Sequence, residues 1–144
     1  MKILFQFALT VLVGFGSLYA GVMNFYSPAD VLTTYYAINI DTFNEGARLA
    51  IESQVRLLSG MWVAAAIAIF TSVTQFEKHG HAIRWILVGM AIGAVGEALT
   101  VFALGGDHVA AAIKATVQIT IYLGLELWRW FLVRKMTAIT ATNS

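Results

Sequence analysis

Four long apolar stretches alternate with short polar connections along the chain, and each is long enough to form a membrane-spanning helix. They cover residues 3–25, 57–73, 83–104 and 109–133. At about 1.5 Å of helical rise per residue, the stretch over 83–104 extends for roughly 33 Å, which is enough to cross the hydrocarbon of a bilayer. The pattern therefore predicts an all-α fold, an integral membrane four-helix bundle.

The one sizeable polar segment between these stretches covers residues 27–54. Ser27 followed by Pro28 is a helix-start signal, so we expect a short interfacial helix over 29–36 at the membrane surface. Residues Thr42 to Glu45 resemble a capping box and predict a helix of about 30 residues whose first third projects from the bilayer. Residues 27–54 are therefore expected to cap one side of the bundle.

Composition supports the membrane assignment. Hydrophobic residues make up 59% of the chain and charged residues 12%, with a mean hydropathy of +0.76, whereas about a quarter of the residues in soluble domains are charged. No linker-like segment divides the sequence, so residues 1–144 are expected to form a single transmembrane domain. The formal net charge of +1 gives no reason to expect nucleic acid as a partner.

Basic residues near the ends of the spans are divided unequally between the two sides of the predicted bundle. Arg48 and Arg56 fall on the side of the 27–54 segment. Six others fall on the opposite side, namely Lys2, Lys78, Arg84, Arg129, Arg134 and Lys135. Because cytoplasmic loops carry an excess of lysine and arginine, we predict that both termini are cytoplasmic and that residues 27–54 lie on the outer side.

Two charged residues within the spans, Glu97 and Lys114, are predicted to lie at similar depth. They are 7 and 5 residues from the outer ends of neighbouring helices, and an isolated charge in a bilayer is unfavourable, so we expect their side chains to meet. Gln118 lies one turn deeper, and Arg56 is a rival partner for Glu97. The pair could fix helix register, form the floor of a ligand pocket, or belong to a proton or ion path.

Small residues share a helix face with Glu97 in the third predicted span. On a 3.6-residue period, Gly89, Gly93, Gly96 and Thr100 fall along one stripe with it. Small residues let helices approach closely, so we expect the stripe to face protein rather than lipid. A small-residue pattern left facing lipid would instead form a dimer contact.

The sequence offers little for metal or cofactor chemistry. It contains no cysteine and no histidine within a span, which excludes thiolate ligands and argues against a haem held between helices. It also lacks a phosphate loop, a nucleophile elbow and a His-Glu zinc motif. We therefore predict no metal site and no cofactor.

Three motifs follow one another along the chain. The first span bears glycines and ends in a proline turn (Gly16, Gly21, Pro28), residues 54–62 read QVRLLSGMW, and the third span contains GMAIGAVGEALT. In these motifs the chain resembles a family of small, uncharacterised bacterial four-helix membrane proteins, a domain of unknown function similar in layout to DoxX-like proteins. The resemblance implies the fold and a bacterial inner (plasma) membrane, but no activity. Glu97 departs from it, because a basic residue is expected there, and Lys114 is an addition.

We favour a non-enzymatic role, in which an accessory or scaffold protein binds a partner subunit or a lipophilic ligand. The expected binding residues are Arg56, Glu97, Lys114 and Gln118, in a polar pocket that opens outward. Membrane lipid, a partner membrane subunit or a second copy of the chain are the expected partners. The first alternative is a membrane enzyme acting on a lipid-soluble substrate, with Glu97 as acid/base beside Lys114. The second is a small transporter, although the sequence lacks the repeats and broken helices typical of one.

Overall fold

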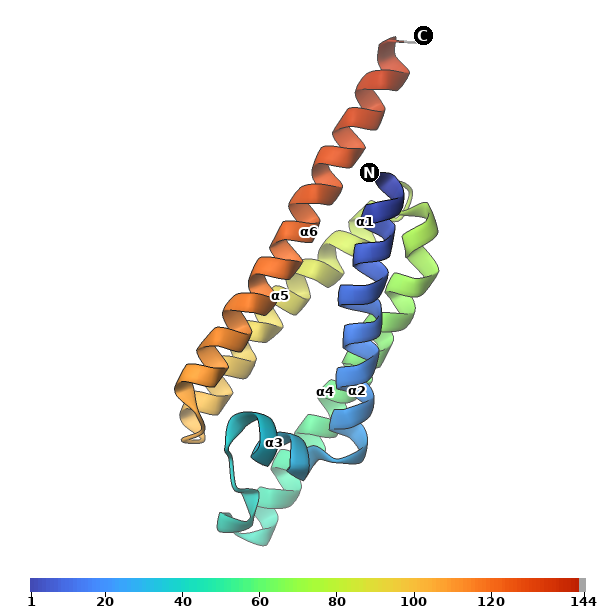
Figure 1. The fold of residues 1–144 in the computed structure, drawn as a ribbon. Helices are drawn as coiled ribbons and strands as arrows, with labels where there is room; N and C mark the ends of the chain where they lie inside the picture. The colour runs from blue at the N-terminus through green and yellow to red at the C-terminus, as the bar shows by residue number, and fades with distance from the viewer. Residues whose placement is uncertain (143–144) are drawn as a thin grey trace.

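The computed structural model describes the backbone of residues 1–142 and the side chains of residues 1–136, and all regular elements in this part are helical (Figure 1). In chain order they are α1 (Lys2–Ala8), the π-helix η1 (Leu9–Phe15), α2 (Gly16–Tyr26), α3 (Pro28–Tyr36), the 3-10 helix η2 (Ile40–Thr42), α4 (Glu45–Ser72), the 3-10 helix η3 (Val73–Gln75), α5 (Gly80–Ala103) and α6 (His108–Thr142).

Four helices in the described residues are long and apolar enough to cross a membrane. They cover Lys2–Tyr26, Glu45–Gln75, Gly80–Ala103 and His108–Met136. The first consists of α1, η1 and α2, which run on without a break. The prediction of an all-α protein with four membrane-capable helices is therefore confirmed.

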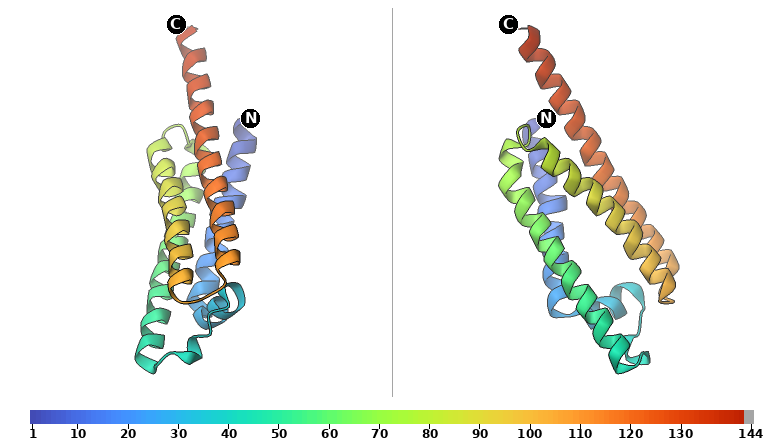
Figure 2. Two further views of the ribbon diagram at one scale, coloured as in Figure 1. Left: turned by 90° about the vertical axis from the view of Figure 1, so that its left-hand side faces the viewer. Right: turned by 180° about the vertical axis from the view of Figure 1, so that it is seen from behind.

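The four long helices form two closely packed pairs, α2 with α4 and α5 with α6. The pairs meet at the end of the bundle that holds the N-terminus and the α4–α5 connection, which we call the convergent end (Figures 1 and 2). They spread apart at the opposite, divergent end, where α3 lies between them near the α5–α6 connection. The shape therefore leaves space between the pairs at one end only.

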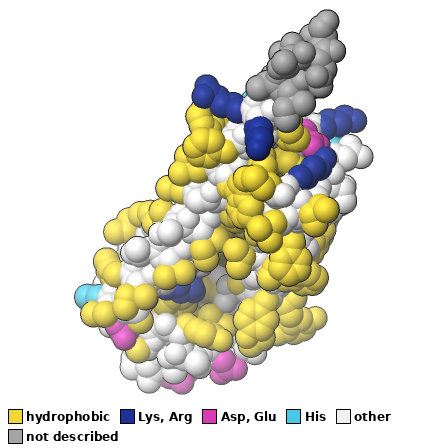
Figure 3. Space-filling model, turned by 45° about the horizontal axis from the view of Figure 1, so that its top comes forward, with side chains coloured by type: hydrophobic (Ala, Val, Ile, Leu, Met, Phe, Trp, Pro, Cys, Tyr) yellow, Lys and Arg dark blue, Asp and Glu magenta, His cyan; other side chains and the backbone are white. Residues whose placement is uncertain are grey.

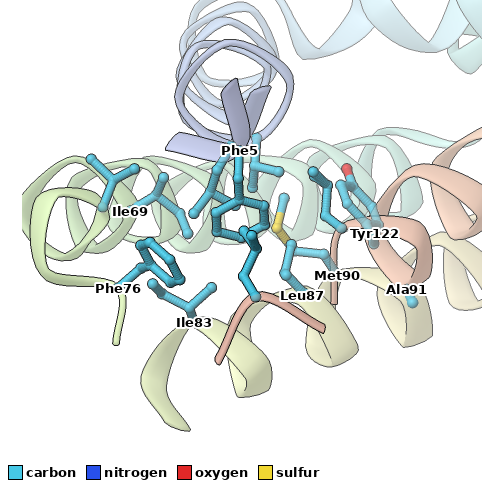
Figure 4. Packing of buried hydrophobic residues seen from close by; sticks show 13 residues of the cluster. Phe5, Ile69, Phe76, Ile83, Leu87, Met90, Ala91 and Tyr122 are labelled. Atoms are coloured by element: carbon cyan, nitrogen blue, oxygen red, sulfur yellow. The ribbon is translucent and has the colours of Figure 1, made fainter. Parts of the chain in front are cut away.

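Large apolar side chains from all four long helices fill the convergent end (Figure 4). Phe5 is fully buried there, and its ring centroid lies 5.0 Å from that of Phe76 and 5.6 Å from that of Trp128. Next to it, the Gln6 Nε2 donates hydrogen bonds to the carbonyls of Val73 (3.1 Å) and Thr74 (3.2 Å). Gln6 thus satisfies carbonyl groups that the end of a helix leaves without partners.

A second apolar cluster surrounds α3 at the divergent end, with Val31, Leu32, Tyr36 and Val101 among its buried members. The short helix expected after Ser27 is present, with Ser27 as N-cap and proline at its first position. It ends at Ala37, which has a left-handed backbone (φ 53°). Burial of one apolar face against α5 and α6 holds this short helix in place, because nine residues are too few for a stable isolated helix.

The α5–α6 connection is fastened to the end of α3. The carbonyl of Tyr36 accepts a hydrogen bond from the Asp107 amide (2.9 Å). A Cβ at Gly106 would lie 2.5 Å from the same carbonyl oxygen and 2.7 Å from Val101 Cγ1, so only glycine allows this approach. Asp107 Oδ1 in turn accepts from the amides of Val109 and Ala110 (3.0 Å each) and caps α6.

The start of α4 differs from the expected capping box. Asn44, not Thr42, is the N-cap, and its Oδ1 accepts from the Ala47 amide (2.9 Å). Thr42 is held in the preceding 3-10 turn, where its hydroxyl donates to the Asn39 carbonyl (2.7 Å). The Thr42 side chain, which the sequence pattern assigned to the helix cap, therefore forms its hydrogen bond within the preceding turn.

The small-residue stripe of α5 was expected to pack against protein, but no other helix in the described part of the chain covers it. Gly89, Gly93 and Gly96 are exposed, and apart from the local helix backbone no described atom lies within 4 Å of where their Cβ would be. Bulkier residues of α5, such as Leu87 and Met90, face the core instead, because they bury more apolar area. The close helix approach occurs at Gly21, whose Cβ would lie 2.8 Å from Val63 Cγ2.

Candidate functional site

Glu97 and Lys114 form an ion pair at the divergent end. Lys114 Nζ donates to Glu97 Oε1 at 2.8 Å, so the contact predicted from their depths is present. The pair joins α5 to α6, and the side chains keep 30% and 40% of their surface exposed, respectively. It therefore lies at the edge of a space rather than within the packed core.

Tyr36 of α3 completes this polar cluster. Its hydroxyl accepts a hydrogen bond from Lys114 Nζ, which also lies 4.4 Å from the centroid of the tyrosine ring. The tyrosine is only 5% exposed. The Glu97 carboxylate and the Tyr36 hydroxyl therefore hold the ammonium group together.

Sequence reasoning did not identify Tyr36 as a residue of the site. The contact joins residues 78 positions apart. No local sequence pattern predicts the contact of Tyr36 with Lys114, because the contact depends on how residues 27–44 fold back over the α5–α6 connection. Only the nearby helix-start signal at Ser27, which predicted α3, pointed to this part of the chain.

A cavity of about 210 Å³ opens beside the ion pair. Residues from α2, α3, α4, α5 and α6 line it, so it lies where the helix pairs spread apart. They are Tyr19, Ala20, Met23, Asn24, Val31, Tyr35, Trp62, Glu97, Lys114 and Gln118. Figure 3 shows a hollow in the surface with a basic side chain near it, bordered by apolar side chains.

The structure brings together three of the four predicted binding residues. Glu97, Lys114 and Gln118 all line the cavity. Gln118 Oε1 is buried and has no hydrogen-bond partner among the described residues. Arg56 is not part of the lining and instead lies 3.4 Å from Glu52, one turn earlier on α4. An ion pair within its own helix therefore occupies the side chain that was expected to compete for Glu97.

A proton or ion path from the Glu97–Lys114 pair does not continue along α6 as a row of free polar groups. Tyr122 is buried in the apolar cluster of the convergent end. Beyond it, Arg129 donates two hydrogen bonds to Glu126, at 2.7 and 2.6 Å. Glu126 and Arg129 thus satisfy one another.

A larger cavity of about 510 Å³ lies at the convergent end, along α6. Its lining is mainly apolar and includes Leu127, Phe131 and Leu132, with Lys135 at one edge. It lacks the cluster of polar groups that orients a ligand in most binding sites. The smaller cavity is therefore the candidate functional site.

Chemically, the candidate site combines a charged and polar floor with walls that are mostly apolar, to which Tyr19, Asn24 and Tyr35 add single polar groups. Its lining carries one carboxylate and one ammonium group, so these formal charges cancel. The described residues contain no group of three or more metal-ligating side chains that could hold an ion. The arrangement suits a molecule with a small polar head and an apolar body.

These features define an all-helical protein with four helices able to cross a membrane and a polar cavity between them. The chain belongs to the family of the domain of unknown function DUF4345, whose model matches residues 4–131. The predicted membership in such a family is thus confirmed, whereas the similarity to DoxX-like proteins stays a prediction. No curated protein and no solved structure matches the chain.

Proposed function

We propose that this protein is a non-enzymatic accessory protein of a bacterial inner membrane that holds a lipophilic ligand in the cavity beside Glu97 and Lys114. The observation that carries the proposal is the cavity itself, which has an ion pair at its floor and side chains from five helices around it. Pockets that combine apolar walls with a few convergent polar groups are typical of ligand sites.

Native mass spectrometry of protein extracted gently from its own membrane tests this proposal. We expect a bound small molecule on the native protein and its loss from Ala20→Phe, since Ala20 lines the cavity and a phenyl ring there would fill it. Ala64→Phe makes the same change on an exposed face of α4 and should keep the ligand. A native protein without a bound molecule, or a ligand retained by Ala20→Phe, would contradict ligand binding in this cavity.

In the proposed orientation both termini are cytoplasmic, and α3 and the first turns of α4 lie on the outer side. The lysine and arginine side chains that gather near the convergent end in Figure 3 support it. The native chain has no cysteine, so single cysteines can be labelled without background. A membrane-impermeant maleimide should label Asp41→Cys in intact cells and Gln75→Cys only after permeabilisation, and the reverse pattern would contradict this orientation.

A second candidate function is an enzyme acting on a lipid-soluble substrate, with Glu97 as acid/base. The observation that favours it is the contact of Tyr36 with Lys114, which adds a second proton-carrying group at the depth of Glu97. Membranes containing the native protein should then hold a lipid product that is absent with Glu97→Gln. Identical lipid profiles would count against catalysis.

We also propose that the exposed stripe of α5 contacts a partner subunit or a second copy of the chain. Gly89, Gly93 and Gly96 support this, because exposed small residues allow a neighbouring helix to approach. Gly93→Leu should lower the oligomeric state measured by native mass spectrometry, whereas Gly16→Leu, at an exposed glycine of α2, should leave it unchanged. An oligomer unaffected by Gly93→Leu would rule out this contact.

A further inference from the structure

The balance of charge in the cavity bears on what kind of head group it accepts. Glu97 and Lys114 lie 2.8 Å apart and are the charged residues of its lining. An acidic or basic head placed beside them meets one group of like charge and one of opposite charge, so attraction and repulsion largely cancel. The ligand would still lose the hydration of its own charge, which makes a charged head unfavourable.

The polar atoms at the floor of the cavity can form further hydrogen bonds. Gln118 Oε1 is buried and lacks a partner among the described residues, and a buried acceptor without a partner is unfavourable. The Glu97 carboxylate can accept more hydrogen bonds than the one that Lys114 donates. Lys114 carries three protons, and its two contacts to Glu97 and Tyr36 leave one to donate. A hydroxyl group, which both donates and accepts, matches this set.

The walls of the cavity suit an alkyl chain that leaves toward the lipid. Ala20, Met23 and Val31 contribute apolar surface. Met23 is 37% exposed and Tyr19 is 61% exposed, so the cavity reaches the outer surface of α2. Its 210 Å³ equal the liquid volume of about seven water molecules, which holds a glycerol-sized head but not a long chain.

We infer that the cavity binds the uncharged, hydroxyl-bearing head of a lipophilic alcohol, of which a monoacylglycerol is the simplest membrane example. This inference rests on the proposed function, because it specifies the ligand class of the same cavity. The hydroxyl groups donate to Gln118 Oε1 and Glu97 and accept from Lys114. The acyl chain leaves past Met23 into the bilayer.

Fluorescence quenching by brominated amphiphiles tests the assignment, because Trp62 lines the cavity. The remaining tryptophans, Trp85, Trp128 and Trp130, are replaced by Phe so that Trp62 alone reports. The protein, in phosphatidylcholine nanodiscs, is titrated with a monoacylglycerol, a fatty acid and an alkylamine of equal chain length, each brominated near the head. We expect saturable quenching by the monoacylglycerol at a concentration at least tenfold lower than for either charged amphiphile.

Two variants locate the head group. Gln118→Leu removes the unpartnered acceptor. It should lower the affinity for the monoacylglycerol about fivefold to tenfold, as expected for the loss of one hydrogen bond. Gln118→Met, which matches the glutamine in length, serves the same purpose if the leucine variant does not fold. Thr120 lies on an exposed face of α6, so Thr120→Val should leave binding of the monoacylglycerol unchanged. A protein that keeps only Trp130 gives the level of nonspecific quenching by bromine in the bilayer.

The outcomes separate this inference from the proposed function. Tighter or equal binding of the acid or the amine would overturn the hydroxyl assignment while leaving the cavity as a ligand site. Saturable quenching that persists unchanged in both Gln118 variants would overturn the hydrogen bond to Gln118, and with it the placement of the head. If none of the three amphiphiles quenches Trp62 saturably, the ligand class is wrong, and the Ala20→Phe measurement decides the proposed function on its own.

Discussion

The ion pair between Glu97 and Lys114 should contribute measurably to the stability of the folded protein. Glu97→Gln leaves the ammonium without its counter-charge, and Lys114→Met leaves the carboxylate without one. In the double variant neither charge remains, so part of the lost free energy of unfolding should be recovered. We therefore expect the double variant to lose less free energy of unfolding than the sum of the two single variants.

The size of this recovery follows from the distance and exposure of the pair. Two unit charges 2.8 Å apart attract by about 6 kcal/mol at an effective dielectric constant of 20 and by about 1.5 kcal/mol in water. With exposed fractions of 40% and 30%, the pair lies between these limits, and desolvation offsets part of the attraction. We expect a coupling free energy of about 1 to 2 kcal/mol and losses of about 1 to 3 kcal/mol for each single variant.

The assay is reversible unfolding by sodium dodecyl sulfate in mixed micelles, followed by circular dichroism. The control is the pair Asp41→Asn and Arg48→Met, whose side chains lie 3.4 Å apart and are 78% and 46% exposed. Exposed ion pairs couple by only a few tenths of a kcal/mol. If the Glu97 and Lys114 variants are additive within about 0.5 kcal/mol, the contact has no energetic role and the reasoning is refuted.

Two further predictions concern the α5–α6 connection. Gly106→Ala should destabilise the protein by about 1 to 3 kcal/mol, because its Cβ would lie 2.5 Å from the Tyr36 carbonyl oxygen. The Cβ of Gly16→Ala would meet no described atom within 4 Å, so that variant should not be destabilised. Equal stability of both variants in the same assay would contradict this packing. Asp107→Ala removes the cap of α6 and should cost about 1 kcal/mol, and Asp107→Asn should restore most of it. A loss that Asn does not restore would mean that capping is not its cause.

The helices could be predicted from the sequence because their signals are local. The apolar stretch over 83–104 corresponds to α5, which covers Gly80–Ala103, and the proline after Ser27 marks the start of α3. The contact of Glu97 with Lys114 could also be predicted, since both residues flank one short connection and counting along two antiparallel helices gives their relative depth. Each of these inferences needs only neighbouring sequence and helix geometry.

Features that depend on long-range packing could not be predicted in this way. A stripe of small residues defines a helix face but not what covers it, so the exposure of Gly89 and Gly93 in the described chain was not predicted. Arg56 was expected near Glu97, yet Glu52 on the same helix is closer. The π-helix over Leu9–Phe15 has no recognised sequence signal, although its wider turn shifts the faces presented by α1 and α2.

Tyr36 shows how the fold links the stability of the bundle to the geometry of the candidate site. Its carbonyl fastens the α5–α6 connection through Asp107, and its hydroxyl contacts Lys114 at the cavity floor. A change that displaces the backbone of Tyr36 must therefore also move a partner of the ammonium group. Gly106→Ala should for this reason weaken ligand binding as well as folding, although Gly106 itself does not line the cavity. Asp107→Asn keeps the hydrogen bond from its amide to the Tyr36 carbonyl and should leave ligand binding intact. The two variants therefore distinguish the effect of the position of α3 on binding from the effect of the capping of α6.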